Sequence, residues 1–424
     1  MRVPRFISAQ PLYANSLWLL LAHGVNYSLG FMFWLVVARL YPPSAVGLAT
    51  AVLPAANMVA SLGMLGLGSS LIRYLSGSGQ GATALINQIS TAVFLAITLF
   101  TAIFLLGIET WSPALRIILT EPLFLVIFVT LVLLTAWQAI LTQTFIASRR
   151  SGYSLTVSLI HGMGKTVAVV VTAFWAGGMG IIFAWTLALM LAVVLAVFVF
   201  LPRVLPDYRL RPHLDFRMLR SIVPYSLANH VAESLVSVPS WILPLLIVNR
   251  LGTEQNAYFG IAWVVATMPF IIPRAVGTAM FAEGSHDLAQ MRSNVIRSLR
   301  LCALMLAPLV LGVVLVGDKL LLFYGEGYAA AGKMLLSVTA LSVLPATVSI
   351  LYVTIARVQK WLWQIVFLSA AEAIGIIVAT LLLIDQLGIL APGVGVLIVN
   401  SFFALALLPR IFRVIHGTGA DEPL

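Results

Sequence analysis

The sequence predicts an all-α membrane protein that crosses the bilayer about twelve times. Hydrophobic residues make up 61% of its 424 residues and charged residues only 9%, whereas a soluble domain carries roughly 25% charged residues. The mean hydropathy is +1.06. The apolar segments are long enough for membrane helices of about 20 residues, and they lack the short alternating pattern of a membrane β-barrel.

Twelve apolar runs meet the length requirement for a spanning helix. The predicted spans are 15–38, 44–71, 87–108, 119–147, 153–175, 178–201, 220–248, 256–281, 298–316, 333–356, 362–384 and 392–414. The first run is longer than the core of a signal peptide and lacks a small-residue cleavage site, so we expect it to be retained as a helix.

The basic residues predict the orientation of these spans. When the N-terminus is placed in the cytoplasm, most of the 24 Lys and Arg residues fall in cytoplasmic loops and helix ends, as the positive-inside rule requires. We therefore expect a multi-pass protein of the bacterial cytoplasmic (inner) membrane with both termini in the cytoplasm. The net charge of +10 reflects this rule and the anionic inner leaflet rather than nucleic-acid binding.

The most basic connection, residues 202–219, divides the chain into two parts. We predict an N-terminal six-helix bundle at 1–201, a cytoplasmic linker at 202–219 and a C-terminal six-helix bundle at 220–424. Six helices in each half give both halves the same orientation, as in parallel transporter repeats. A faint internal echo supports this, because VARLYPPSAVGLATA (37–51) and VNRLGTEQNAYFGIA (248–262) each join the first and second spans of a half.

Span five contains HGMGKT (161–166), which resembles the end of a nucleotide-binding loop. The first glycine of a Walker A loop would fall at Leu159, and no strand precedes the stretch, so we exclude a nucleotide site. His161 and Lys165 instead share one helix face with Ser154 and Ser158. A lysine so deep in a span is costly, and such residues usually serve function.

Further polar residues follow helical spacing in other spans. They are His23 and Asn26 in span one, Asn57 in span two, His230 and Glu233 in span seven, Arg274 in span eight and Glu372 in span eleven. Together with Lys165, these residues predict a hydrated cavity between the halves with a cationic balance, which suits a phosphate or diphosphate group. No metal-ligand spacing and no nucleophile–base pair is present, so we expect no metal, no cofactor and no enzyme activity.

Three segments resemble the polysaccharide-exporter branch of the MOP superfamily. They are LLFYGEGYAAAGKMLLSVTA (321–340), LYPPSAVGLATAV (40–52) and GLGSSLIRYLSGSG (66–79). The resemblance implies a MATE-like, V-shaped pair of six-helix bundles related by a pseudo-twofold axis along the membrane normal. It also implies a flippase that moves undecaprenyl-diphosphate-linked oligosaccharides for the assembly of O-antigen, capsule or exopolysaccharide, beside membrane lipids and a polysaccharide polymerase or chain-length machinery.

The resemblance also implies roles for particular residues. In a related lipid II flippase branch, cavity arginines on early helices and on the eighth helix matter, and Arg274 matches the latter. Arg39 and Arg73 do not match the early arginines, and two further helices of that branch are missing here, which argues against a lipid II flippase.

We expect Lys165 and Arg274 to hold the diphosphate. The residues expected to bind the rest of the substrate are His23, Asn26, Asn57, His161 and His230. Glu233 or Glu372 is a candidate to carry a coupling H⁺ or Na⁺.

Two alternative functions remain open from the sequence. A cation-coupled multidrug or organic-cation antiporter of the same fold would need an acidic or aromatic cavity, and the two acids Glu233 and Glu372 keep it possible. A membrane glycan polymerase or ligase would need large outward loops, and the longest one expected here, at 317–332, is short.

Overall fold

A computed structural model describes residues 11–75, 81–175, 177–206, 208–209, 211–286 and 291–416. The side chains of 11–23 and of a few other helical residues lie outside this description. Every regular element in the described part is a helix. The chain divides into two compact units, the first ending at Ser234 and the second beginning at Leu235.

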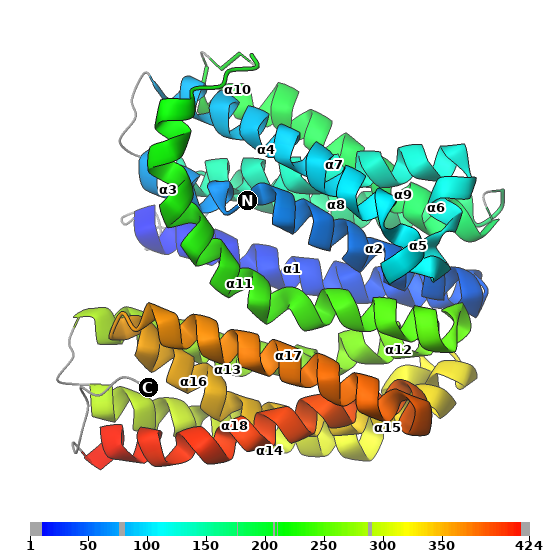
Figure 1. The fold of residues 1–424 in the computed structure, drawn as a ribbon, viewed down its shortest axis with the longest axis vertical. Coiled ribbons are helices and arrows are strands. Elements are labelled where there is room, and N and C mark those ends of the chain that lie inside the picture. Colours follow the sequence, from blue (N-terminus) through cyan, green and yellow to red (C-terminus); the bar gives the residue numbers. More distant parts are fainter. Residues whose placement is uncertain are drawn as a thin grey trace. The chain divides into compact units, whose positions relative to one another are not determined.

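Unit 1 is coloured from blue to green in Figure 1. Its helices are α1 (Pro11–Leu40), α2 (Pro43–Met64), α3 (Leu67–Leu75), α4 (Ala82–Leu106), α5 (Ile108–Trp111), α6 (Ile117–Thr120), α7 (Pro122–Ala147), α8 (Ser151–Thr172), α9 (Gly180–Leu195), α10 (Leu201–Val204) and the first part of α11 (Phe216–Leu251). A π-helical turn, η4 (Ala196–Phe200), joins α9 to α10. Within this unit α8 packs against both α1 and α9, and α2 packs against α4 and α7.

Unit 2 contains the rest of α11 and the helices that follow it. These are α12 (Thr253–Ala266), α13 (Ile271–His286), α14 (Met291–Leu322), α15 (Glu326–Leu341), α16 (Val343–Val358), α17 (Leu362–Leu387) and α18 (Ala391–His416). Here α17 packs against α18, α14 against α15, and α12 against α15.

The described helices account for every predicted span. Nine stretches are long and apolar enough to cross a membrane, and the pair α15 and α16, bent by 40°, makes a tenth. One of the nine, Leu362–Arg413, holds α17 and α18 in succession, and α1 contributes the shorter apolar stretch Gly24–Leu40. Each predicted range therefore coincides with one helix or one broken pair, and the chain is a multi-pass, all-α membrane protein.

One prediction about the loops was wrong. The expected outward loop at 317–332 is mostly helical, because α14 continues to Leu322 and α15 begins at Glu326. Gly325 makes the sharp turn between them with φ of 139°, a conformation that favours glycine. An ion pair between Lys333 Nζ and Asp318 Oδ2 at 3.3 Å links the two helices.

The helix ends support the internal echo of the sequence. The last residues of α1 and α11 are Leu40 and Leu251, which are equivalent positions when 37–51 is aligned with 248–262. The second predicted span is broken in each half, between α2 and α3 and between α12 and α13. The boundary between compact units lies inside α11, so the predicted bundles 1–201 and 220–424 stay a proposal about a repeat.

The surface of the described helices is apolar, as lipid contact requires. Leu106, Phe174 and Trp363 are each more than four-fifths exposed, and a soluble protein rarely exposes many such side chains together. The single cysteine, Cys302 on α14, is buried.

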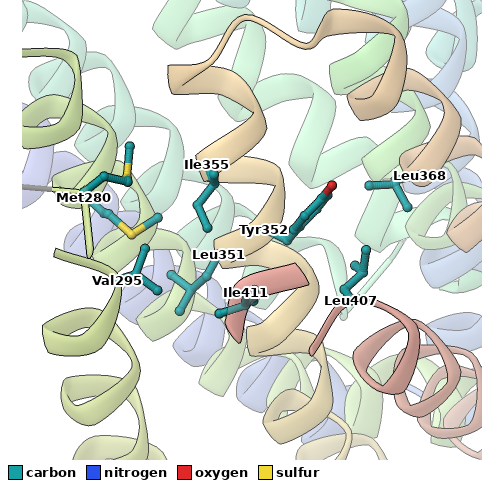
Figure 2. Packing of buried hydrophobic residues seen from close by; sticks show 9 residues of the cluster. Met280, Val295, Leu351, Tyr352, Ile355, Leu368, Leu407 and Ile411 are labelled. Atoms are coloured by element: carbon teal, nitrogen blue, oxygen red, sulfur yellow. The ribbon is translucent and has the colours of Figure 1, made fainter. Parts of the chain in front are cut away.

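Unit 2 has a buried hydrophobic cluster that Figure 2 shows from close by. Its members come from five helices and are Met280, Met291, Val295, Leu351, Tyr352, Ile355, Leu368, Leu407 and Ile411. The ring of Tyr352 packs in the cluster, and its hydroxyl donates to Gln364 Oε1 at 3.4 Å on α17. Arg410 on α18 donates to the same hydroxyl at 3.5 Å, so the polar tip of this buried tyrosine is satisfied.

Candidate functional site

Helices α1 and α8 pack in parallel with a constant register. Asn26 Nδ2 donates to Ser158 Oγ at 3.2 Å, Leu29 lies against Gly162, and Phe33 lies under Lys165. The sequence separation is 132 for the first of these pairs and barely changes along the two helices. The two spans therefore run in the same direction, as the alternating topology predicts for the first and fifth spans.

Lys165 is enclosed by aromatic rings at the centre of this packing. Its Nζ lies 3.7 Å from the ring centroid of Trp185 on α9 and 4.9 Å from that of Phe33 on α1. The two rings also meet edge to face, with their centroids 5.2 Å apart. Only 7% of Lys165 is exposed. We call Phe33, His161, Lys165 and Trp185 the Lys165 aromatic site.

The two glycines of HGMGKT explain why the helices come so close. A Cβ on Gly162 would collide with the side chain of Leu29 on α1, and one on Gly164 would lie 3.3 Å from the Cβ of Ala188 on α9. Small residues at such positions let helix backbones approach in membranes. The motif that resembles a nucleotide loop is thus a packing motif that places the lysine between two neighbouring helices.

His161 lies one helical turn before Lys165 and contacts the same tryptophan. Its ring meets Trp185 edge to face at a centroid distance of 5.3 Å. Among the described residues, its buried Nε2 has no hydrogen-bond partner. Trp185 therefore contacts both His161 and Lys165.

The Lys165 aromatic site holds a cation without an acid. Among the described residues, no carboxylate forms a salt bridge with Lys165 within 4.0 Å. A cation–π contact supplies about 0.5–2 kcal/mol, which is less than the several kcal/mol that burying an ion costs. The aromatic contacts therefore offset only part of the free-energy cost of burying the Lys165 charge. A charged residue kept inside a membrane at such a cost is a candidate for a functional role.

Unit 2 holds its intramembrane charges differently. Arg274 on α13 follows the break between α12 and α13 and is exposed, whereas Glu372 on α17 is half-buried. The guanidinium of Arg274 lies close enough to interact electrostatically with the Glu372 carboxylate. The structure thus brings together one candidate substrate-binding residue and one candidate for ion coupling.

His230 is positioned by the packing of α11 on the turn between α2 and α3. Gly66 in this turn has φ of 71°, and a Cβ there would collide with the carbonyl oxygen of Ser226 and with His230. Ser226 also hydrogen-bonds to Ser70 on α3 through the two hydroxyl groups. His230 is half-buried, and its Nε2 forms a hydrogen bond of 3.2 Å with Ser234 Oγ.

The remaining predicted residues lie apart from the lysine. Asn57 on α2 and Glu233 on α11 are exposed, and the side chain of His23 lies outside the described residues. Phe33 and Trp185 were missed, because the search of the sequence considered only polar residues.

The comparisons with known proteins agree with this architecture. The model of a family described as "Polysaccharide biosynthesis protein" matches residues 36–333, which is more than half of the chain. No curated protein sequence matches the chain significantly.

Solved structures of two kinds share the fold. An inward-facing multidrug resistance MATE family transporter of the MOP superfamily matches with a TM-score of 0.72 and 13% identity over 94% of this chain and 96% of that one. The lipid II flippase MurJ in an inward closed conformation matches with a TM-score of 0.71 and 14% identity over 94% and 89%. An outward-facing multidrug resistance MATE family transporter matches with a TM-score of 0.61 and 15% identity over 97% of this chain and 98% of that one. The chain therefore has the fold that these MATE transporters share with MurJ, and it belongs to the polysaccharide biosynthesis protein family.

Proposed function

We propose that this protein flips an undecaprenyl-diphosphate-linked oligosaccharide across the bacterial cytoplasmic membrane by alternating access, with both termini in the cytoplasm. The observation that carries the proposal is that Lys165 is buried in a membrane helix and forms no salt bridge with a carboxylate among the described residues. The family to which the chain belongs is described as "Polysaccharide biosynthesis protein". A buried cation that lacks an internal counterion suits a negatively charged cargo.

Lys165 and Arg274 are the proposed diphosphate ligands. Arg274 is exposed, so a phosphate can reach it without rearrangement of its own helix. Lys165 is covered by Phe33 and Trp185 and must leave these rings to bind a phosphate. This makes Lys165 the residue whose contacts differ between an occupied and an empty state, and only such differential contacts can drive a conformational change.

The remaining polar residues predicted from the sequence are the proposed partners of the sugar. Asn26 and Asn57 are exposed, and their side-chain amides both donate and accept hydrogen bonds. His23, His161 and His230 add ring nitrogens of the kind that bind hydroxyl groups. Glu372 is the proposed site of a coupling H⁺ or Na⁺, because a phosphate on Arg274 and the carboxylate of Glu372 compete for the same guanidinium. Glu233 is the second candidate for that ion.

Polymer export in cells tests this function. A strain that lacks the chain is complemented with the wild type, with Lys165→Ala/Arg274→Ala, and with Lys165→Arg/Arg274→Lys, which keeps both charges. We expect the alanine pair to abolish surface polymer and to leave the lipid-linked precursor on the cytoplasmic side. Full export by the alanine pair, at wild-type protein levels, would refute the role of the two cations.

A cation-coupled drug antiporter is the second candidate function. The half-buried Glu372 and the fold shared with MATE transporters favour it. Under this alternative, deletion of the gene raises susceptibility to organic cations, and Glu372→Gln reproduces the effect. Normal drug tolerance combined with loss of surface polymer would exclude it.

A further inference from the structure

The basic connection between α10 and α11 is fixed to the body of unit 1. Residues 205–215, which we call the basic strap, contain no helix in their described part. Three polar residues from the first turns of α4 bind its main chain. Asn87 Nδ2 donates to the carbonyl of Arg209 at 2.7 Å, and Gln88 Nε2 donates to that of Asp215 at 2.6 Å. Thr91 Oγ1 accepts from the main-chain amide of His213 at 3.1 Å.

Two of these anchoring side chains, Asn87 and Gln88, are polar and buried. Asn87 is 5% exposed and Gln88 is 1% exposed. Their amides donate hydrogen bonds to main-chain carbonyls of the strap, and buried hydrogen bonds of this kind stabilise the folded state. The strap is thus a built element and not a loose linker.

Both ends of the strap are also defined. At its start Tyr208 is half-buried, and this burial raises the pKa of its hydroxyl. At its end Asp215 caps α11, since its Oδ1 accepts from the main-chain amide of Arg217 at 2.8 Å. An aspartate at this position satisfies an amide at the helix N-terminus.

The fixed strap presents a group of exposed guanidinium groups. The exposed arginines on it and on its flanking helices are Arg203, Arg209, Arg211, Arg217 and Arg220. The turn between α7 and α8 adds the exposed Arg149 and Arg150. The first turn of α8, which follows these arginines, packs against η4, because Tyr153 stacks on Phe200 at 5.4 Å between ring centroids.

We propose that the basic strap binds the phosphate groups of anionic phospholipids in the cytoplasmic leaflet. The strap lies at the ends of membrane helices, where head groups lie. Arginine forks match phosphate oxygens in geometry and charge. Each basic residue near an anionic leaflet adds to the electrostatic attraction, and fixing the main chain removes part of the ordering cost of binding.

Lipid binding by the purified full-length protein tests this proposal. The protein in a non-ionic detergent is titrated with fluorescent phosphatidylglycerol, with phosphatidylcholine as the zwitterionic comparison and inorganic phosphate as a free-anion competitor. Arg209→Gln/Arg211→Gln is expected to weaken phosphatidylglycerol binding roughly tenfold and to leave phosphatidylcholine binding unchanged. The matched control, Arg292→Gln/Arg297→Gln, removes the same charge from exposed positions on α14 and is expected to change binding less than about twofold.

A second variant tests whether lipid binding needs the fixed conformation of the strap or only its positive charge. Asn87→Leu/Gln88→Leu keeps every arginine and removes two anchors of the strap. We expect it to weaken phosphatidylglycerol binding about threefold or more, with a thermal unfolding scan to show that the protein remains folded. Equal losses in the strap and control arginine pairs would overturn the proposal. Wild-type binding by the anchor variant, or full competition by millimolar inorganic phosphate, would also overturn it.

Discussion

The two units accommodate intramembrane charge in opposite ways. In unit 1, Lys165 is buried among Phe33, His161 and Trp185 and has no nearby acid in the described residues. In unit 2, Arg274 is exposed and interacts with the acid Glu372. Aromatic rings stabilise a cation without neutralising it, whereas an acid of opposite charge attracts it electrostatically. The first arrangement therefore leaves the charge available to a cargo, and the second makes the cargo compete with an internal acid.

Replacement of Lys165 by an uncharged residue of similar length tests the first arrangement most strongly. Lys165→Met is expected to reduce polymer export roughly tenfold or more, because a charged hydrogen bond is worth about 1.5–3 kcal/mol. The same variant is expected to unfold at the wild-type temperature or higher, since an unpaired buried charge is costly. Export assays in cells and thermal unfolding of the purified protein measure the two effects. A large fall in stability would assign Lys165 a structural role instead.

The packing that frames the polar residues of unit 1 is expected to depend on Gly66. Gly66→Ala should lower the free energy of unfolding by about 1–3 kcal/mol, because the position combines a positive φ with close backbone contact. Gly312 on α14 of unit 2 has no atom within 4 Å of a built Cβ, so Gly312→Ala serves as the matched control and should not destabilise. Equal stability of the two variants in chemical unfolding would contradict the packing described for α11.

Graded changes at Trp185 sharpen the role of the aromatic rings. Trp185→Phe keeps a ring near Lys165 and should cost less than about 1 kcal/mol, whereas Trp185→Leu should cost about 2 kcal/mol more. In the Lys165→Met background the difference between the two substitutions should shrink, because no cation remains. If the difference stays the same in that background, the ring serves only to fill space.

A double-mutant cycle at Arg274 and Glu372 tests the second arrangement. Arg274→Gln and Glu372→Gln are each expected to change export, and the double variant should differ from the product of the single effects by about two- to fivefold, as for a partly exposed charge pair. Strict multiplication of the single effects would show that the two side chains act independently.

Most of the fold was predictable from the sequence, because long apolar runs and the placement of arginines constrain a membrane protein strongly. Each predicted span matches a helix or a broken pair. The breaks at Leu65 and at Ser342 were not predicted, since hydropathy is continuous across both positions. The helical extension to Leu322 was not predicted, because the predicted span ended at residue 316, whereas Asp318 in the extension pairs with Lys333.

The candidate site was predictable in part. Helical spacing identified the stripe of His161 and Lys165 on α8, and Arg274 and Glu372 were both named as candidates. The partners of Lys165 could not be found in this way, because Phe33 and Trp185 lie more than a hundred residues from each other and look like ordinary apolar positions. Only the packing of α1 and α9 on the glycines of α8 brings them to the lysine.

The lone buried thiol has a practical consequence. Since Cys302 is 1% exposed, maleimide reagents should leave the native chain unlabelled, and a single cysteine introduced elsewhere becomes a clean reporter. Impermeant reagents applied from either side of the membrane can then read which ends of the helices face the cytoplasm. Cysteines placed beside Lys165 can record, during turnover, when the rings around it open to water.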